Sequence, residues 1–275
     1  MLPSYLLSLR EGIEAALIIG IVLGALRQMR RTDFSSVVWM GVISASVLSV
    51  LAGILLTALG LSFEGSAEQI FEGITMLLAA SVLTWMIFWM SRQARNIKGE
   101  LENGVHKATF EGGKRGLFAL AFLAVLREGI ELALFLVASV FASDVQQTLI
   151  GTFLGLGTAI LLGWSLFATT VRLDLRRFFR VTGFLLILFA AGLVAHGVHE
   201  FNEAGLVPSV IEHVWDVSPI LDENATLGSM LKALFGYNGN PSLTEILSYF
   251  LYFLLIFFGL RLSKRREGAR VQPQA

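Results

Sequence analysis

The chain has 275 residues, 55% of them hydrophobic and 15% charged, and a mean hydropathy of +0.71. A soluble domain carries about a quarter charged residues, so this composition indicates a membrane protein. The 21 basic and 21 acidic residues balance, which gives no reason to expect a nucleic-acid partner. The absence of cysteine excludes disulfides, thiolate metal sites and cysteine nucleophiles.

Seven apolar segments are long enough to cross the hydrocarbon, which takes about 20 helical residues. Lipid offers no partner for backbone polar groups, and the segments lack the short alternating pattern of barrel strands, so we expect helices. The first segment follows no basic signal-peptide region and is expected to be retained. The expected spans are 2–26, 37–61, 68–90, 116–141, 148–170, 178–200 and 244–262.

The connections between these spans alternate in charge. Basic residues gather at 27–31, 92–115 and 172–180 and in the tail at 261–270, whereas the other connections hold acidic residues such as Asp144. Basic connections stay in the cytoplasm, so we expect the N-terminus outside and the C-terminus inside a cytoplasmic (inner) membrane.

The chain also repeats itself. Residues 9–17 and 126–134 share the sequence Leu-Arg-Glu-Gly-Ile-Glu, and the two copies are 117 residues apart. Three expected helices separate the copies, so they cross the membrane in opposite directions. We therefore expect an inverted repeat of three plus three helices within one transmembrane domain, with a substrate site where the repeats meet. Repeat 1 covers about 1–92, repeat 2 about 115–203, an outer loop about 201–243, and the seventh helix about 244–262.

Each motif copy places two glutamates three positions apart, on one face of its helix. Hard carboxylate oxygens suit hard cations, and intramembrane charges usually mark an ion path. The alternative, two Arg–Glu clusters that only lock the helices together, would bury six ionisable groups for packing alone. The motif glycines permit close helix contact. The candidate metal ligands are Glu11, Glu14, Glu128 and Glu131, with Arg10 and Arg127 as supporting charges.

A fifth candidate ligand, Glu72, lies on the third expected helix in a similar Phe-Glu-Gly-Ile sequence. Glu64, Glu68 and Glu72 recur every fourth residue and form one acidic stripe from the outer surface inward. This stripe could be an outer access path, or Glu64 and Glu68 could be a solvated helix start that the helix dipole favours.

The sixth expected helix ends in a second polar face. His196, His199, Glu200 and Glu203 have the spacing i, i+3, i+4 and i+7, which indicates an access or relay face near the outer surface. The alternative is an ordinary polar helix end at the headgroups. The outer loop that follows, 201–243, is mildly amphipathic. We expect short helices on the outer face that either cap the bundle or receive a delivery partner.

These motifs resemble the oxidase-dependent iron permeases, and most closely their bacterial EfeU-like branch. The resemblance spans essentially the whole chain. Besides the paired Arg-Glu-Gly-Ile-Glu motifs, it rests on the segments 71–74, 83–90, 203–206 and 234–237.

The resemblance implies a permease and not an enzyme. It implies import of Fe(III), produced by oxidation of Fe(II) outside, with the motif glutamates as ligands. Iron is then the substrate and no cofactor is permanently bound. Bacterial members are often accompanied by a periplasmic cupredoxin-like protein and a haem peroxidase. The acidic, Ser-rich outer motif of fungal relatives is not evident here.

Three other classes of function remain open from the residues alone. A proton-coupled transporter or exchanger of another divalent metal would use the same carboxylates. An intramembrane hydrolase could use paired glutamates as acid and base, but no nucleophile motif accompanies them. A structural or receptor-like subunit would leave the buried charges without a purpose.

The topology makes a direct prediction, because a chain without cysteine can be labelled at single introduced positions. A membrane-impermeant maleimide should label Ser66→Cys in intact cells and should miss Thr32→Cys and Asn103→Cys. Labelling of Asn103→Cys from outside would give both motifs the same orientation and contradict the inverted repeat.

Overall fold

The computed structural model describes residues 1–93, 97–142, 145–168, 174–222, 225, 228, 231–232 and 235–270. The regular elements among these residues are helices, which confirms the expected all-α class. The chain divides into two compact units, each described by itself. Unit 1 is Met1–Phe63 with Met90–Leu186, and unit 2 is Glu64–Trp89 with Ile187–Ala275.

Seven long helices coincide with the seven expected spans. Five of these regions are long and apolar enough to cross a membrane: 32–60, 66–89, 145–165, 177–203 and 243–261. The protein is therefore a multi-pass membrane protein. The helices are α1 (Leu2–Gln28), α2 (Ser35–Gly60), α3 (Ser66–Gln93), α5 (Gly113–Ala142), α6 (Val145–Ala168), α7 (Leu175–Glu203) and α9 (Leu243–Arg270).

The helices α1 and α5 are outside that set of five, although they contain 27 and 30 residues. Each carries one copy of the charged motif near its middle, which lowers its apolar character. Charges of this kind inside a membrane helix are expensive and must face the protein interior. Arg10, Glu11, Glu14, Glu128 and Glu131 are indeed buried.

One helix was not expected from the sequence. The connection 92–115 contains α4 (Ile97–Lys107) and the π-helical turn η2 (Ala108–Gly112). Val105 of α4 is fully buried with Leu26 and Leu117, so the connection packs against unit 1. A mostly polar helix of 11 residues has too short an apolar face to stand out in a sequence. Asp144 and residues 94–96 and 169–173, on which part of the topology prediction rests, lie outside the described residues.

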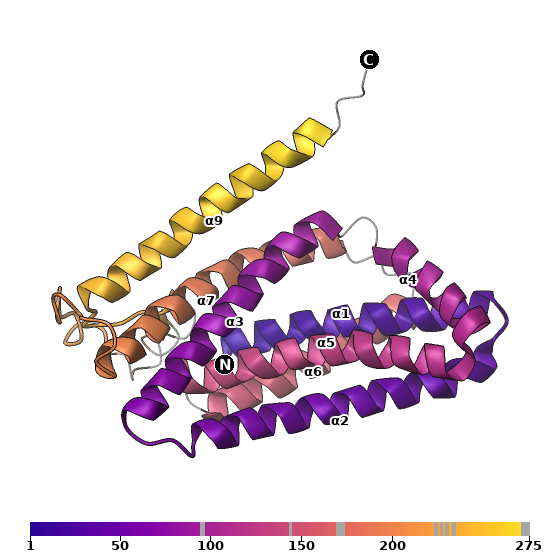
Figure 1. Cartoon of the computed structure of the whole chain (residues 1–275), viewed down its shortest axis with the longest axis horizontal. Coiled ribbons are helices and arrows are strands. Elements are labelled where there is room, and N and C mark those ends of the chain that lie inside the picture. The colour runs from indigo at the N-terminus through magenta and orange to yellow at the C-terminus, as the bar shows by residue number, and fades with distance from the viewer. Residues whose placement is uncertain are drawn as a thin grey trace. The chain divides into compact units, whose positions relative to one another are not determined.

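Unit 1 is built from two parallel helix pairs (Figure 1). The helix α1 packs chiefly on α6, and α5 packs chiefly on α2. Gly151 of α6 lies against Ser4, and Gly163 lies against Ala16, so α1 and α6 run in the same direction. By contrast, α1 and α5 are antiparallel, because the end of α1 and the start of α5 share one apolar cluster.

The contacts of one helix pair recur in the other. A shift of 117 residues relates α1 to α5, and a shift of 110 residues relates α2 to α6. In both pairs, glycines allow one helix to approach the other closely, as the small-residue rule for membrane helices predicts. Three contacts recur in this way: Gly12–Ala159 with Gly129–Ser49, Gly151–Met1 with Gly41–Phe118, and Gly163–Ala16 with Gly53–Ala133.

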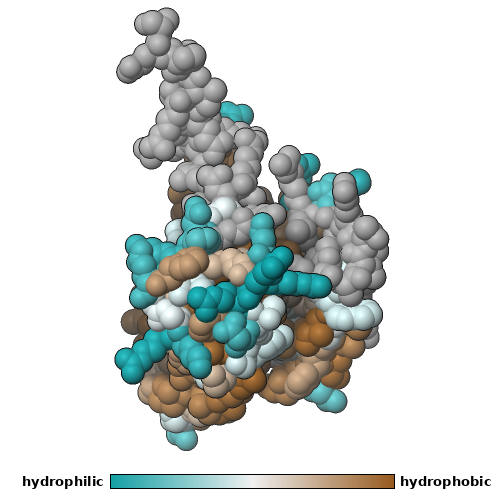
Figure 2. Space-filling model, turned by 90° about the vertical axis from the view of Figure 1, so that its right-hand side faces the viewer, coloured by the Kyte–Doolittle hydropathy of each residue, from teal (hydrophilic) through white to brown (hydrophobic). Residues whose placement is uncertain are grey.

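Exposed basic residues gather where α1 ends and α5 begins. They include Arg27, Arg30, Arg31, Lys114 and Arg115. Figure 2 looks toward this end and shows hydrophilic residues there, with hydrophobic residues beside them.

Unit 2 contains most of α3, the second half of α7, and α9. Gly73 of α3 lies against the backbone of Gly197 on α7, and Thr84 of α3 bonds the hydroxyl of Tyr252 on α9 at 2.8 Å. The loop after α7, residues 204–242, also contacts α7 itself. Gly236 adopts a positive φ of 65° and contacts Gly192, eleven residues before α7 ends. Neither position has a Cβ, and this permits the approach.

The helix contacts in unit 1 predict the effect of one added methyl group. A Cβ on Gly155 would lie 2.5 Å from the carbonyl oxygen of Tyr5, so Gly155→Ala should destabilise the protein by about 1–3 kcal/mol. A Cβ on Gly157 meets nothing within 4 Å, so the control Gly157→Ala should stay within about 0.5 kcal/mol. Melting of the purified protein in detergent measures both. Equal melting temperatures would contradict the packing of α1 on α6.

Candidate metal centre

Three buried carboxylates converge in unit 1. Glu11 comes from α1, and Glu128 and Glu131 come from α5. One oxygen from each lies within 4.8 Å of the others. Their side chains meet because α1 and α5 cross as antiparallel helices with both motifs near their middles. Among the described residues, this is the group of three whose geometry could hold a metal ion.

An arginine supports each motif in the same way. The Arg10 Nε donates to Glu14 Oε1 at 3.1 Å, and the Arg127 Nε donates to Glu131 Oε1 at 2.9 Å. Arg127 also lies 3.8 Å from Glu128 Oε1. In both copies the partners are four residues apart on one helix face. The repeated sequence therefore produces a repeated side-chain geometry.

Several carboxylate oxygens of the cluster lack a hydrogen-bond partner. They are both oxygens of Glu11 and the Oε2 atoms of Glu128 and Glu131. Buried polar atoms are nearly always satisfied in folded proteins, so a group of unsatisfied carboxylate oxygens needs a proton or a cation. The donor set consists of hard oxygens, which suits Mg²⁺, Ca²⁺, Mn²⁺ or ions of higher charge.

Of the five glutamates expected as ligands, three lie together in unit 1. Glu11, Glu128 and Glu131 lie together, whereas Glu14 is not in that group and instead accepts a hydrogen bond from Arg10. Glu72 lies in unit 2, half-buried on α3 beside the Gly73 contact with α7. The cluster therefore contains one glutamate from the first motif copy and two from the second.

The polar residues that were expected to form an access path belong to unit 2 and have mixed environments. Glu64 is exposed before α3 begins, and Glu68 is partly exposed in its first turn, as a solvated helix start would be. His196, His199 and Glu200 are partly buried near the end of α7, and Glu203 is exposed. Among the described residues, they form no group of three with metal-binding geometry.

Sequence reasoning missed Glu245, the partner of His199. The His199 Nδ1 lies 2.9 Å from Glu245 Oε1, and its Nε2 lies 3.2 Å from Glu203 Oε1. The Glu245 side chain is only 5% exposed. The available signal was Ser242-Leu-Thr-Glu245, a capping box. It predicts the start of α9, but it does not predict the pairing with α7.

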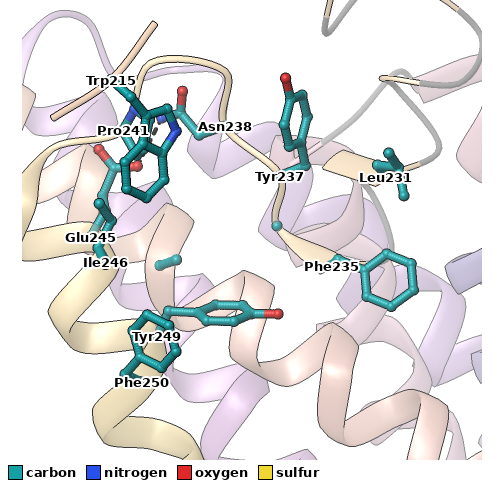
Figure 3. A pocket seen from close by; sticks show the side chains of 12 residues that line it. Trp215, Leu231, Phe235, Tyr237, Asn238, Pro241, Glu245, Ile246, Tyr249 and Phe250 are labelled. Atoms are coloured by element: carbon teal, nitrogen blue, oxygen red, sulfur yellow. Dashed lines mark hydrogen bonds between the residues drawn. The ribbon is translucent and has the colours of Figure 1, made fainter. Parts of the chain in front are cut away.

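A cavity of about 350 Å³ lies beside Glu245. Aromatic side chains that include Trp215, Tyr249 and Phe250 surround it (Figure 3). Both Glu245 oxygens are engaged, one by His199 and the Ser242 N–H and the other by the Asn238 amide at 2.8 Å. A single engaged carboxylate in an aromatic wall does not make a metal site, so the cavity is no rival to the cluster in unit 1.

Known proteins resemble this chain along its whole length. The model of the Iron permease FTR1 family matches residues 1–270. The proteins named Ferrous iron permease EfeU from Shigella sonnei (strain Ss046) and Escherichia coli O157:H7 are both 37% identical over 280 residues, with 100% of each chain covered. The Yersinia pestis protein of the same name is 36% identical, over 94% of this chain and 93% of its own. No solved structure matches.

The two arginines should respond differently to replacement by lysine. Lysine keeps the charge but loses the planar guanidinium that holds a carboxylate. The Arg10 side chain is 2% exposed and that of Arg127 36% exposed. Arg10→Lys should therefore destabilise the protein by about 1–3 kcal/mol, and Arg127→Lys by less. The exposed Arg27→Lys is the control. Melting curves that are alike for Arg10→Lys and Arg27→Lys would contradict the structural role of Arg10.

Proposed function

Because this chain belongs to the iron permease FTR1 family, as its motifs predicted, we propose that it imports iron through the carboxylates of Glu11, Glu128 and Glu131. The observation that carries this proposal is the set of buried carboxylate oxygens without hydrogen-bond partners. Such oxygens on facing helices repel one another when ionised, and a multivalent cation relieves that repulsion. The relatives are named iron permeases, and the cation that we assign is iron.

We propose that the ion in the cluster is Fe(III). Three ionised glutamates match its charge, and hard oxygen ligands match its chemistry. The relatives are named for ferrous iron. The two descriptions agree if Fe(II) is supplied and is oxidised outside the membrane before transfer. The resemblance suggests a periplasmic cupredoxin-like protein and a haem peroxidase as the oxidising partners.

We propose seven spans in an inverted repeat, with the N-terminus outside and the C-terminus inside the cytoplasmic membrane. The recurrence of the α1–α6 contacts in α5–α2 supports the repeat. The exposed basic residues at the end of α1 and the start of α5 support a cytoplasmic location for that end. The cluster would then lie within the membrane, between helices of the two halves.

The other motif residues have supporting roles in this proposal. Arg10 and Arg127 orient Glu14 and Glu131 and offset negative charge when the cluster is empty. Glu72 on α3 is a further candidate metal ligand. Glu64, Glu68, His196, His199, Glu200 and Glu203 are candidates for outer access or proton relay, and the His199–Glu245 pair favours a structural part for His199.

Uptake of radiolabelled iron into cells that express the chain tests the ligand assignment. Glu11→Gln, Glu128→Gln and Glu131→Gln should each lower uptake by about tenfold or more at equal protein level in the membrane. Glu14→Gln should lower it less. The exposed Glu111→Gln is the control and should transport normally. Normal uptake by Glu128→Gln and Glu131→Gln would contradict the site.

The same assay separates the competing function and the oxidation state. Iron supplied as ferric citrate should be taken up, and iron held ferrous by ascorbate without oxygen should be taken up more slowly. Excess Mn²⁺ or Zn²⁺ should compete weakly. Strong transport of Mn²⁺ or Zn²⁺ would favour a general divalent-metal transporter.

A further inference from the structure

The two ends of unit 1 differ in polarity although their packing is related by the repeat. At the end where α1 and α6 begin and α5 ends, five buried positions carry hydroxyl groups. Each of these residues is exposed by 8% or less. They are Ser4, Ser8, Ser139, Thr148 and Thr152.

The corresponding positions at the opposite end are all apolar. The shifts of 117 and 110 residues that relate the helix contacts also relate each hydroxyl to one buried apolar side chain. These five residues belong to a single hydrophobic cluster that also contains Leu26 and Leu117. In the same order they are Ala121, Val125, Val22, Val38 and Val42.

Local packing does not explain this asymmetry. Hydroxyls in helices often bond the carbonyl four residues earlier, as Thr152 does with Thr148 and Ser139 with Phe135, both at 2.8 Å. Such a bond leaves acceptor capacity on the hydroxyl oxygen. The related valines fill equivalent places in the other helix pair, so the packing itself does not require a hydroxyl.

Ser8 connects the hydroxyl end to the carboxylate cluster. It is fully buried, and its Oγ has no hydrogen-bond partner. It lies three residues before Glu11, on the same face of α1. A buried hydroxyl without a partner is a place for a water molecule or for an ion that still carries water.

We propose that the hydroxyl end is the route by which hydrated iron reaches the cluster from outside, and that the apolar end is the seal on the cytoplasmic side. This inference rests on the proposed function, because it takes the cluster as the iron site and the start of α1 as external. The hydroxyl residues and their apolar counterparts are all buried in this structure. A small separation of α1 from α6 admits water beside hydroxyls, whereas the same opening at the other end of α5 and α2 exposes the side chains of the hydrophobic cluster, among them Val38, Val42 and Val125.

The free-energy cost of dehydrating an ion explains why the polarity of each end matters. An ion that moves past apolar side chains loses its water without replacement, which is costly in a medium of low polarity. Hydroxyl oxygens replace part of that hydration. The polarity of the two ends therefore determines which side the empty cluster exchanges with more readily, even though the helix packing is nearly symmetric.

Introduced cysteines can compare the two ends at matched depth, because the chain has none of its own. The pairs are Ser8→Cys with Val125→Cys, and Thr152→Cys with Val42→Cys. A small cationic methanethiosulfonate reacts with thiolates in water. When it is added to intact spheroplasts, it should modify the hydroxyl-end cysteine of each pair at least about tenfold faster, since a thiol in a dry apolar cluster ionises poorly. With two pairs, the comparison can still be made if one variant does not fold.

The effect of iron on the rate of cysteine modification distinguishes a failure of this inference from a failure of the proposed function. Ferric citrate should slow the reaction of Ser8→Cys, and adding Glu128→Gln should remove the protection while leaving the reaction itself. Persistent protection with Glu128→Gln would overturn the iron site, while the difference between the ends would still support the route. Equal rates within both pairs would overturn the route, and so would reaction of Ser8→Cys in inverted vesicles only.

Discussion

Three buried carboxylates whose oxygens approach within 4.8 Å must be held against their own repulsion where α1 and α5 meet. The surrounding structure serves this requirement. Arginines four residues before Glu14 and Glu131 fix those side chains from the same helix. Both oxygens of Glu11 and one oxygen each of Glu128 and Glu131 are left without hydrogen bonds.

The carboxylates meet because other helices hold α1 and α5 in place. Each of these two helices packs on a partner from the opposite half of the sequence, α1 on α6 and α5 on α2, through glycines such as Gly12 and Gly129. Unit 1 therefore takes the first two long helices of each half, and unit 2 takes most of the third of each. Neither half forms a compact unit alone, so a site between the motifs depends on both halves folding together.

The two helix pairs of unit 1 pack in nearly the same way but differ in polarity at a few buried positions. Glycines at related positions in the two helix pairs contact related residues, yet one end of unit 1 carries buried hydroxyls and the other valines and alanine. In unit 2, the outer loop reaches Gly192, and the His199–Glu245 pair joins the end of α7 to the start of α9.

Much of the molecule follows from local sequence. Long apolar segments in lipid have to become helices, and all seven were located to within a few residues, except that α9 continues to Arg270. The Arg–Glu contacts of the repeated motif are local, because residues four apart on a helix are neighbours whatever surrounds them. The family, too, was recognisable from the motifs alone.

Tertiary structure decided what depends on distances between helices. Spacing treated Glu11 and Glu14 alike, but only the crossing of α1 and α5 shows that Glu11 joins Glu128 and Glu131. Glu245 completes a capping box in the sequence, but its pairing with His199 depends on the start of α9 lying beside the end of α7. The five hydroxyls are ordinary residues in the sequence. Only the helix contacts show that these hydroxyls are buried and that they correspond to five apolar positions. The polarity of a side chain has a large energetic effect where the side chain is buried, and burial is a property of the assembled fold.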